Sequence, residues 1–66
     1  MNDLQPHQQR VVDEKEALDS KIEPLNTFLQ GVVFSTLDIA EQNRLTLQLQ
    51  VMHVYSTILA QRISAF

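Results

Sequence analysis

The stretch LTLQLQVMHVYSTILAQRISAF, residues 45–66, decides the fold because its apolar residues recur at helical spacing along two separate faces. The first stripe consists of Leu45, Leu49, Met52, Leu59, Ile63 and Phe66, with Tyr55 or Ser56 in the gap after Met52. The second stripe consists of Leu47, Val51, Val54 and Ile58. A hairpin of two helices can cover only one stripe, so the other stripe is expected to meet another chain.

The start of this helix is marked by the run DIAEQ, residues 38–42. Asp38 and Glu41 have the spacing of a capping box, with Asp in place of the usual Ser or Thr. We therefore expect a helix from about Asp38 to near the C-terminus, about 28 residues or roughly 42 Å long.

A single apolar stripe predicts another helix from about Pro6 to Gln30. Pro6 suits the first helical turn, because its missing N–H would be unpaired there in any case. The remaining faces of this segment are polar and rich in acids, which is typical of a helix that is solvated on one side. The stripe consists of Val11, Leu18, Ile22, Leu25 and Leu29.

Pro24 lies inside this predicted helix, where a proline removes a backbone hydrogen bond and clashes with the preceding turn. We expect the helix to bend there. The alternative is a break into two shorter helices, because Ser20 and Glu23 have the spacing of a capping box for a fresh start. Both alternatives keep the apolar stripe on one side.

The connection between the two helices is unusually apolar. Gly31, the only glycine, follows the first helix where a left-handed residue is usually needed, so we place the end of the helix there. The residues that follow include Val32, Val33, Phe34 and Leu37. This composition predicts that the connection packs under a neighbouring element or subunit.

These elements predict a single all-α domain of residues 1–66. It would be a bent helical hairpin with a short N-terminal tail, a kinked first helix and a long second helix. A chain of 66 residues buries only about 60% of its unfolded surface, and such chains usually need a disulfide, a metal or a partner subunit. The chain has no Cys, so a compact homo-oligomer is the expected solution.

Charge and hydropathy exclude several classes of function. The net charge of −3, with five Lys and Arg against eight Asp and Glu, argues against wrapping long nucleic acid. A small anionic ligand needs only a few well-placed cations and is compatible with this balance. The N-terminus has no signal-peptide core, and no apolar run approaches the roughly 18 residues of a membrane span. We therefore expect an intracellular, soluble protein without a membrane partner.

Catalytic and metal-binding patterns are weak. His7 and His53 lie far apart in the sequence, and no serine has a neighbouring base and orienting acid. The acids between residues 13 and 19 have no His at the helical spacing of metal ligands, so they are interpreted as a wet helix face. We therefore predict no enzyme, no catalytic residue, no metal and no cofactor.

Three cations are better placed for a ligand. Arg10 and Lys21 are eleven residues apart, about three turns, and so lie nearly on one face of the first helix. Oligomer symmetry would bring several copies of these residues to one anion. Arg62 lies in the last turn of the second helix, where a cation normally offsets the helix dipole. Repeated around a symmetry axis, its guanidinium would instead suit phosphate oxygens.

The runs PHQQRVVDEKEALDSKI, LNTFL and LQLQVMHVYSTILAQRISAF resemble the phage anti-CBASS cyclic-oligonucleotide sponge family, of the anti-CBASS protein 2 type. The resemblance covers nearly the whole chain. Its elements are a Gln-Gln-Arg-Val opening, a Leu-x-x-Phe-Leu/Ile helix end, an AEQ-x-R-L restart and a Met-x-x-Tyr-Ser-x-Ile-Leu-x-x-Arg-Ile close. Together these elements are fairly specific, whereas each alone would be weak.

The resemblance implies a compact helical homohexamer in the cytoplasm of the host cell. It would bind cyclic dinucleotides between protomers and cyclic trinucleotides at separate sites near three-fold axes, without cleaving them. Lys21 matches the family's phosphate-binding lysine, and Arg62 resembles the cation of the trinucleotide site. His7 is the nearest candidate for the family's base-stacking aromatic, because Pro6 and His7 occupy that region. The ligand-binding candidates are His7, Arg10, Lys21 and Arg62.

Two hypotheses follow for the function. The first is a phage anti-defence protein that sequesters cyclic di- and trinucleotide messengers and so blocks CBASS immunity. The second is a small helical adaptor or inhibitor that uses the second stripe to bind a host protein. A stable hexamer in solution would favour the first, and a monomer with an exposed second stripe would favour the second.

Overall fold

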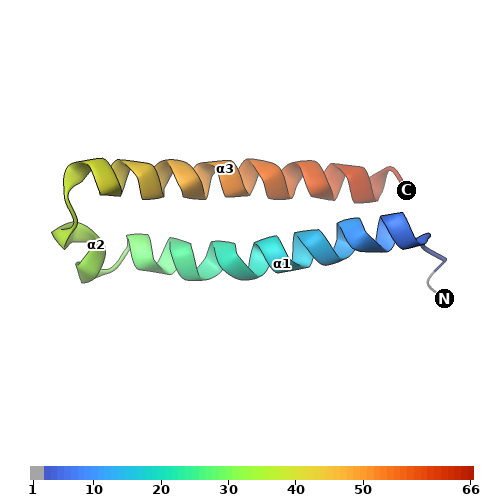
Figure 1. The fold of residues 1–66 in the computed structure, drawn as a ribbon, viewed down its shortest axis with the longest axis horizontal. Helices are drawn as coiled ribbons and strands as arrows, with labels where there is room; N and C mark the ends of the chain where they lie inside the picture. Colours follow the sequence, from blue (N-terminus) through green and yellow to red (C-terminus); the bar gives the residue numbers. More distant parts are fainter. Residues whose placement is uncertain (1–2) are drawn as a thin grey trace.

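The computed structural model describes residues 3–66, and all the regular structure in this range is helical. Helix α1 spans Pro6–Leu29, α2 spans Val32–Thr36 and α3 spans Ile39–Ser64. Helices α1 and α3 run antiparallel side by side, with α2 at one end of the hairpin and both termini at the other (Figure 1). The predicted all-α hairpin is confirmed.

Helix α3 begins as the capping pattern predicted. The Asp38 carboxylate accepts a 2.9 Å hydrogen bond from the backbone N–H of Glu41, which would otherwise lack a partner in the first turn. Glu41 in the first turn and Arg62 in the last turn both have the sign of charge that the helix dipole favours. Local sequence therefore accounts for where α3 begins and for the sign of the charges in its first and last turns.

Helix α1 begins with Pro6 in its first turn and continues through Pro24 without interruption. The Ser20 hydroxyl donates to the carbonyl of Ala17 at 2.6 Å and does not cap a new helix, so the predicted alternative of a break is wrong. Pro24 leaves the carbonyl of Ser20 without its usual donor. Both residues are exposed, so water can supply the missing hydrogen bond and the helix persists.

Gly31 does not end α1 in the predicted left-handed conformation. Its φ and ψ are −93° and 170°, which is extended backbone, and it forms the N-cap of α2. The end of α1 is closed by tight hydrogen bonds from the N–H of Gln30 to Thr27 O (3.1 Å) and from Gly31 to Phe28 O (3.0 Å). Because these bonds satisfy the last carbonyls, no left-handed residue is required.

The connection at α2 is only partly covered by the chain itself. The rings of Phe28 and Phe34 meet edge to face with their centroids 6.4 Å apart, and the side chain of Gln42 donates to Leu37 O at 2.8 Å. Val32 remains 81% exposed, and Val33 is also exposed. The prediction that the connection packs under a neighbouring element is thus confirmed for Phe34, which contacts α1 through Phe28. Val32 and Val33 are largely exposed in the single chain.

The core lies where α1 packs against the first stripe of α3. Leu59 is fully buried and Val11 nearly so, and the other apolar residues of the α1 stripe and of the first α3 stripe are half-buried, except Phe66. Ser56, which is half-buried, fills the gap in the first stripe, whereas Tyr55 is exposed. Phe66 lies beyond the end of α3 and is exposed, so its predicted place in this stripe is wrong. The half-buried apolar members are Leu18, Ile22, Leu25, Leu29, Leu45, Leu49, Met52 and Ile63.

The second stripe of α3 lies on the outside of the hairpin, with Leu47, Val51, Val54 and Ile58 between 48% and 60% exposed. The molecule measures 48 × 16 × 14 Å and its radius of gyration is 15.2 Å, against about 11 Å for a globular domain of this length. Its accessible surface is 4993 Å², against about 4,300 Å² expected from its mass. The chain alone is therefore more extended, and exposes more total surface, than a typical monomer of its mass. Within the described range, no helix is long and apolar enough to cross a bilayer.

Candidate ligand-binding surface

The four candidate residues His7, Arg10, Lys21 and Arg62 are all exposed, and they lie at two places on the hairpin. His7 and Arg10 belong to the first turns of α1, and Arg62 belongs to the last turn of α3. Because the helices are antiparallel, all three lie toward the end that carries the termini (Figure 1). Lys21 lies eleven residues beyond Arg10, about 16 Å further along α1. One chain therefore does not bring the four into a single pocket.

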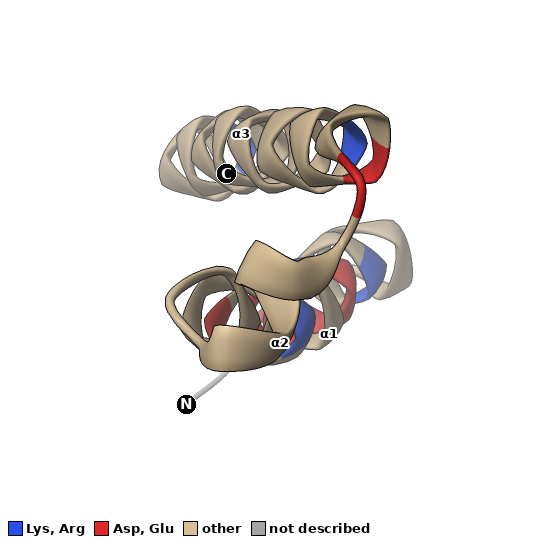
Figure 2. Cartoon of the chain, turned by 90° about the vertical axis from the view of Figure 1, so that its left-hand side faces the viewer, with Lys and Arg blue, Asp and Glu red and all other residues tan. Residues whose placement is uncertain are grey.

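The ion pairs of the chain separate the cations into two groups. Lys15 Nζ lies 2.6 Å from Asp19 Oδ2, and Arg44 Nε lies 2.8 Å from Glu41 Oε1. Within residues 3–66, Arg10, Lys21 and Arg62 make no ion pair. The end-on view shows acidic and basic residues on both long helices, and the sequence places more of them on α1 than on α3 (Figure 2). The three cations that the sequence singled out are thus those that make no ion pair with another described residue.

These unpaired cations have the chemistry for an anionic ligand. The guanidinium groups of Arg10 and Arg62 each offer a planar fork of donors that matches two oxygens of a phosphate, and Lys21 adds a compact positive charge. His7 is exposed in the first turn of α1, where its imidazole is accessible to a ligand or to another chain. The arrangement provides charge and donors, and each chain alone leaves them open to solvent.

A hollow on the outer side of α1 is acidic, unlike the surface around the candidate cations. It is a shallow, open depression lined by Asp13, Glu16, Ala17 and Ser20. Two carboxylates in its wall would repel a phosphate, so this hollow does not suit a nucleotide. Among the described residues, no group of His, Asp and Glu is arranged to hold a metal ion.

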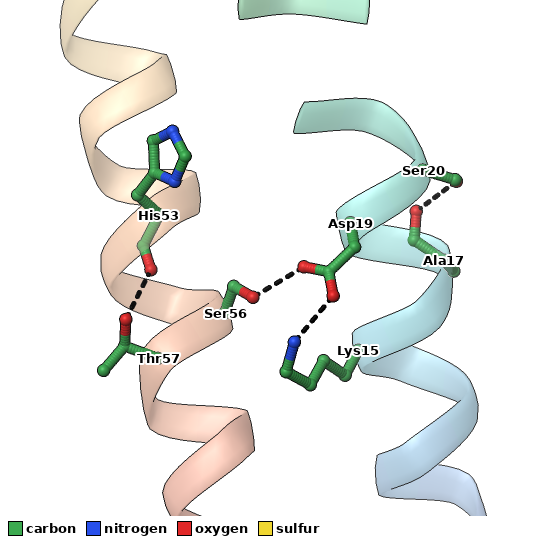
Figure 3. A network of polar contacts seen from close by, with 7 residues as sticks. All are labelled: Lys15, Ala17, Asp19, Ser20, His53, Ser56 and Thr57. Atoms are coloured by element: carbon green, nitrogen blue, oxygen red, sulfur yellow. Dashed lines mark hydrogen bonds and ion pairs between the residues drawn. The ribbon is translucent and has the colours of Figure 1, made fainter. Parts of the chain in front are cut away.

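A polar network links the two long helices at mid-length (Figure 3). The Asp19 carboxylate accepts 2.6 Å hydrogen bonds from Lys15 Nζ on its own helix and from the hydroxyl of Ser56 on α3. The bond from Lys15, and then the bond from Ser56, lower the pKa of Asp19 below its ordinary value, while partial desolvation opposes them.

Local sequence patterns do not predict this network. They place Asp19 on a solvated acidic face of the first helix and offer Ser56 only as one way to fill the gap in the first stripe. The available signals were the interruption of the apolar stripe at Ser56 and the spacing of four residues between Lys15 and Asp19.

Comparison with known proteins identifies the family. The family model described as Sequestin matches residues 5–65, which is nearly the entire chain. The chain belongs to the Sequestin family. No curated protein and no solved structure matches it.

The name Sequestin denotes a protein that binds and sequesters and does not point to an enzyme. It is consistent with the resemblance to a sponge family that the sequence motifs carry. Sequestration requires a surface that holds a ligand, with no need for a group that breaks bonds. Arg10, Lys21 and Arg62 are exposed and make no ion pair within residues 3–66, so their hydrogen-bond donors are open to solvent.

Proposed function

We propose that this sequestin is a phage anti-defence protein that binds cyclic di- and trinucleotide messengers of the host and withholds them from CBASS effectors without cleaving them. The observation that supports this most is that Arg10, Lys21 and Arg62 are exposed and carry no ion pair within the described chain. A cyclic dinucleotide carries two phosphodiester charges and a trinucleotide three, so a few converging cations suffice to neutralise them.

Assembly is part of the proposal. The chain would form a homohexamer, in which the exposed second stripe of α3 meets other copies and is removed from water. Burying the four side chains of this stripe would contribute about 1.5–3 kcal/mol each if they were fully covered. Such an interface would compensate for the small core of a single chain, in which Leu59 is the one fully buried large side chain in the described range.

The ligand sites are proposed to lie at the seams between chains. In one chain, Lys21 is separated along α1 from the end where His7, Arg10 and Arg62 lie, so each group forms only part of a site. Symmetry would repeat both parts. We assign Lys21 to the phosphates of a cyclic dinucleotide, with His7 beside its base, and Arg62 to a cyclic trinucleotide. Arg10 would add charge to either site.

Calorimetry with a panel of cyclic dinucleotides and trinucleotides tests the proposal. We expect saturable binding of at least one ligand of each class, while the linear dinucleotides of the same sequence serve as matched controls and bind more weakly. Heating the complex and separating the released ligand by chromatography should return the intact cyclic compound. Absence of binding to every member of the panel would contradict nucleotide binding, and recovery of linear product would contradict sequestration without cleavage.

The exposure of the second stripe also fits a different function, that of an adaptor or inhibitor that binds a host protein. In that case the stripe would stay free until the partner arrives, and the chain would be a monomer in solution. Measurement of its mass by light scattering separates the two functions, because the proposed sponge is a stable hexamer.

A further inference from the structure

The two apolar stripes of α3 differ in their number of apolar side chains and in whether a polar residue interrupts them. Burial of apolar surface is non-directional and depends mainly on the area removed from water. The second stripe is uninterrupted, whereas the first contains the polar Ser56 at its centre. Nevertheless it is the first stripe that packs against α1, and the second that remains exposed. Apolar burial favours the first stripe, which has five large apolar side chains within α3 against four in the second, but burial does not account for the polar Ser56 at its centre.

The facing side of α1 carries a matching polar interruption. Lys15 and Asp19 lie between Val11 and Ile22, and their side chains are 27% and 44% exposed. Asp19 has one oxygen bonded to Lys15, and the other accepts the hydroxyl of Ser56 at 2.6 Å. This side-chain hydrogen bond joins α1 to α3 (Figure 3). The two interruptions therefore meet each other across the helix pair.

We propose that the hydrogen bond between Asp19 and Ser56 selects which stripe of α3 packs against α1. If α3 were rotated so that its second stripe faced α1, Val54 and Ile58 would lie opposite Asp19 in place of Ser56. Neither side chain can donate a hydrogen bond. The Asp19 carboxylate would then lose water on the packed side without gaining a donor, which penalises the rotated arrangement.

The same bond fixes the register of the hairpin. A slip of α3 by one turn would bring Met52 or Ala60 opposite Asp19 in place of Ser56, and again no donor would be present. Rows of leucine and isoleucine tolerate such a slip, because one apolar side chain covers another almost as well. A single polar pair within an apolar seam is known to specify register in this way, at some cost in stability.

The selection has a consequence for the outer surface. By holding the first stripe on α1, Asp19 and Ser56 leave Leu47, Val51, Val54 and Ile58 together on the outside. A chain with α3 rotated would instead present the stripe with a polar centre. The two residues thus determine the surface that a chain offers to other copies, although they lie inside the hairpin. This inference concerns one chain and does not depend on nucleotide binding.

Methyl-labelled NMR tests the inference directly. Labelled chain is refolded with an excess of unlabelled chain, so that only contacts within a chain are observed. The natural sequence should give one set of methyl resonances, with nuclear Overhauser effects between Ile22 and Leu25 of α1 and the first stripe of α3. Ser56→Ala should remain helical and show a second set carrying about a tenth of the signal or more, with contacts to the second stripe.

Three variants control for other effects. Ser56→Thr keeps the hydroxyl and Asp19→Asn keeps an oxygen that accepts it, so both should show the single original set. Thr57→Ala removes a neighbouring hydroxyl that donates to His53 O in its own helix, and it should also behave as the natural chain. A single unchanged set in Ser56→Ala would overturn the inference. Loss of helicity in that variant would also overturn it, because the hydroxyl would then be needed for folding itself.

Discussion

Lys15 Nζ lies 2.6 Å from Asp19 Oδ2, one turn further along α1, and its ammonium holds the pKa of the Asp19 carboxyl below the ordinary value of 3.8. The hydroxyl of Ser56 acts in the same direction from α3. A carboxyl whose pKa is lowered by folding stabilises the folded state above its unfolded pKa and loses this effect as the pH falls through its folded pKa.

The first prediction is therefore that the difference in stability between the natural chain and Asp19→Asn depends on pH. At pH 7, Asp19→Asn should unfold at a lower urea concentration than the natural chain, because it lacks the ion pair with Lys15. Below pH 4 the difference should shrink toward zero as Asp19 itself becomes neutral. Urea midpoints at equal protein concentration from pH 7 to pH 2.5 measure it. A difference that stays constant over this range would contradict the role given to the Asp19 charge.

The second prediction concerns the core. Leu59 is completely buried, so Leu59→Ala should lower the free energy of unfolding by about 2–5 kcal/mol. Gln61→Ala is the matched control, because Gln61 is exposed on the same helix and its change should stay within about 0.5 kcal/mol. Denaturant unfolding followed by circular dichroism gives both values. Equal effects for the two variants would mean that α3 does not pack through its first stripe.

Features that depend on residues close together in the sequence could be predicted, whereas contacts between distant residues could not. The cap at Asp38 and both stripes of α3 were found because they depend on residues within a few positions of one another. The choice between Tyr55 and Ser56 was left open, since adjacent residues differ by only about 100° around a helix. The partner of Ser56 is Asp19, 37 positions away, and no local pattern pairs them.

The predicted left-handed conformation of Gly31 was wrong for a different reason. Glycine ends many helices in the left-handed conformation, but the need depends on how the last carbonyls are satisfied. Here the backbone N–H groups of Gln30 and Gly31 itself satisfy carbonyls in the last turn, and the chain enters α2 in extended conformation. The candidate cations Arg10, Lys21 and Arg62 were selected by residue type and position. The sites proposed for them lie between chains, and the periodicity of one chain does not specify such sites.

The third prediction tests the second stripe as an assembly surface. Val51→Glu places a charge in the middle of the stripe and should reduce the mass of the particle in solution, because a buried unpaired charge opposes association. Gln50→Glu adds the same charge at the adjacent exposed position and should leave the mass unchanged. Light scattering coupled to gel filtration measures both. An unchanged mass for Val51→Glu would show that the stripe is not the interface.

The fourth prediction concerns the unpaired lysine. Lys21→Ala should weaken binding of a cyclic dinucleotide about tenfold or more, as expected for loss of one charged hydrogen bond worth about 1.5–3 kcal/mol. Arg44→Ala removes the same charge from a side chain already paired with Glu41, and it should change affinity less than about twofold. Calorimetry gives the affinities, and light scattering verifies that both variants assemble. Loss of assembly in Lys21→Ala would assign the lysine a structural role.

The central claim is that assembly creates the sites at which this sequestin holds cyclic nucleotides. Native mass spectrometry tests it most directly, because one spectrum reports both the number of chains and the mass of any ligand they carry. With a mixture of cyclic di- and trinucleotides, we predict a hexamer that carries intact cyclic ligands, and no ligand on residual monomer. A monomer as the sole species, or a hexamer that remains free of ligand throughout the titration, would contradict the claim.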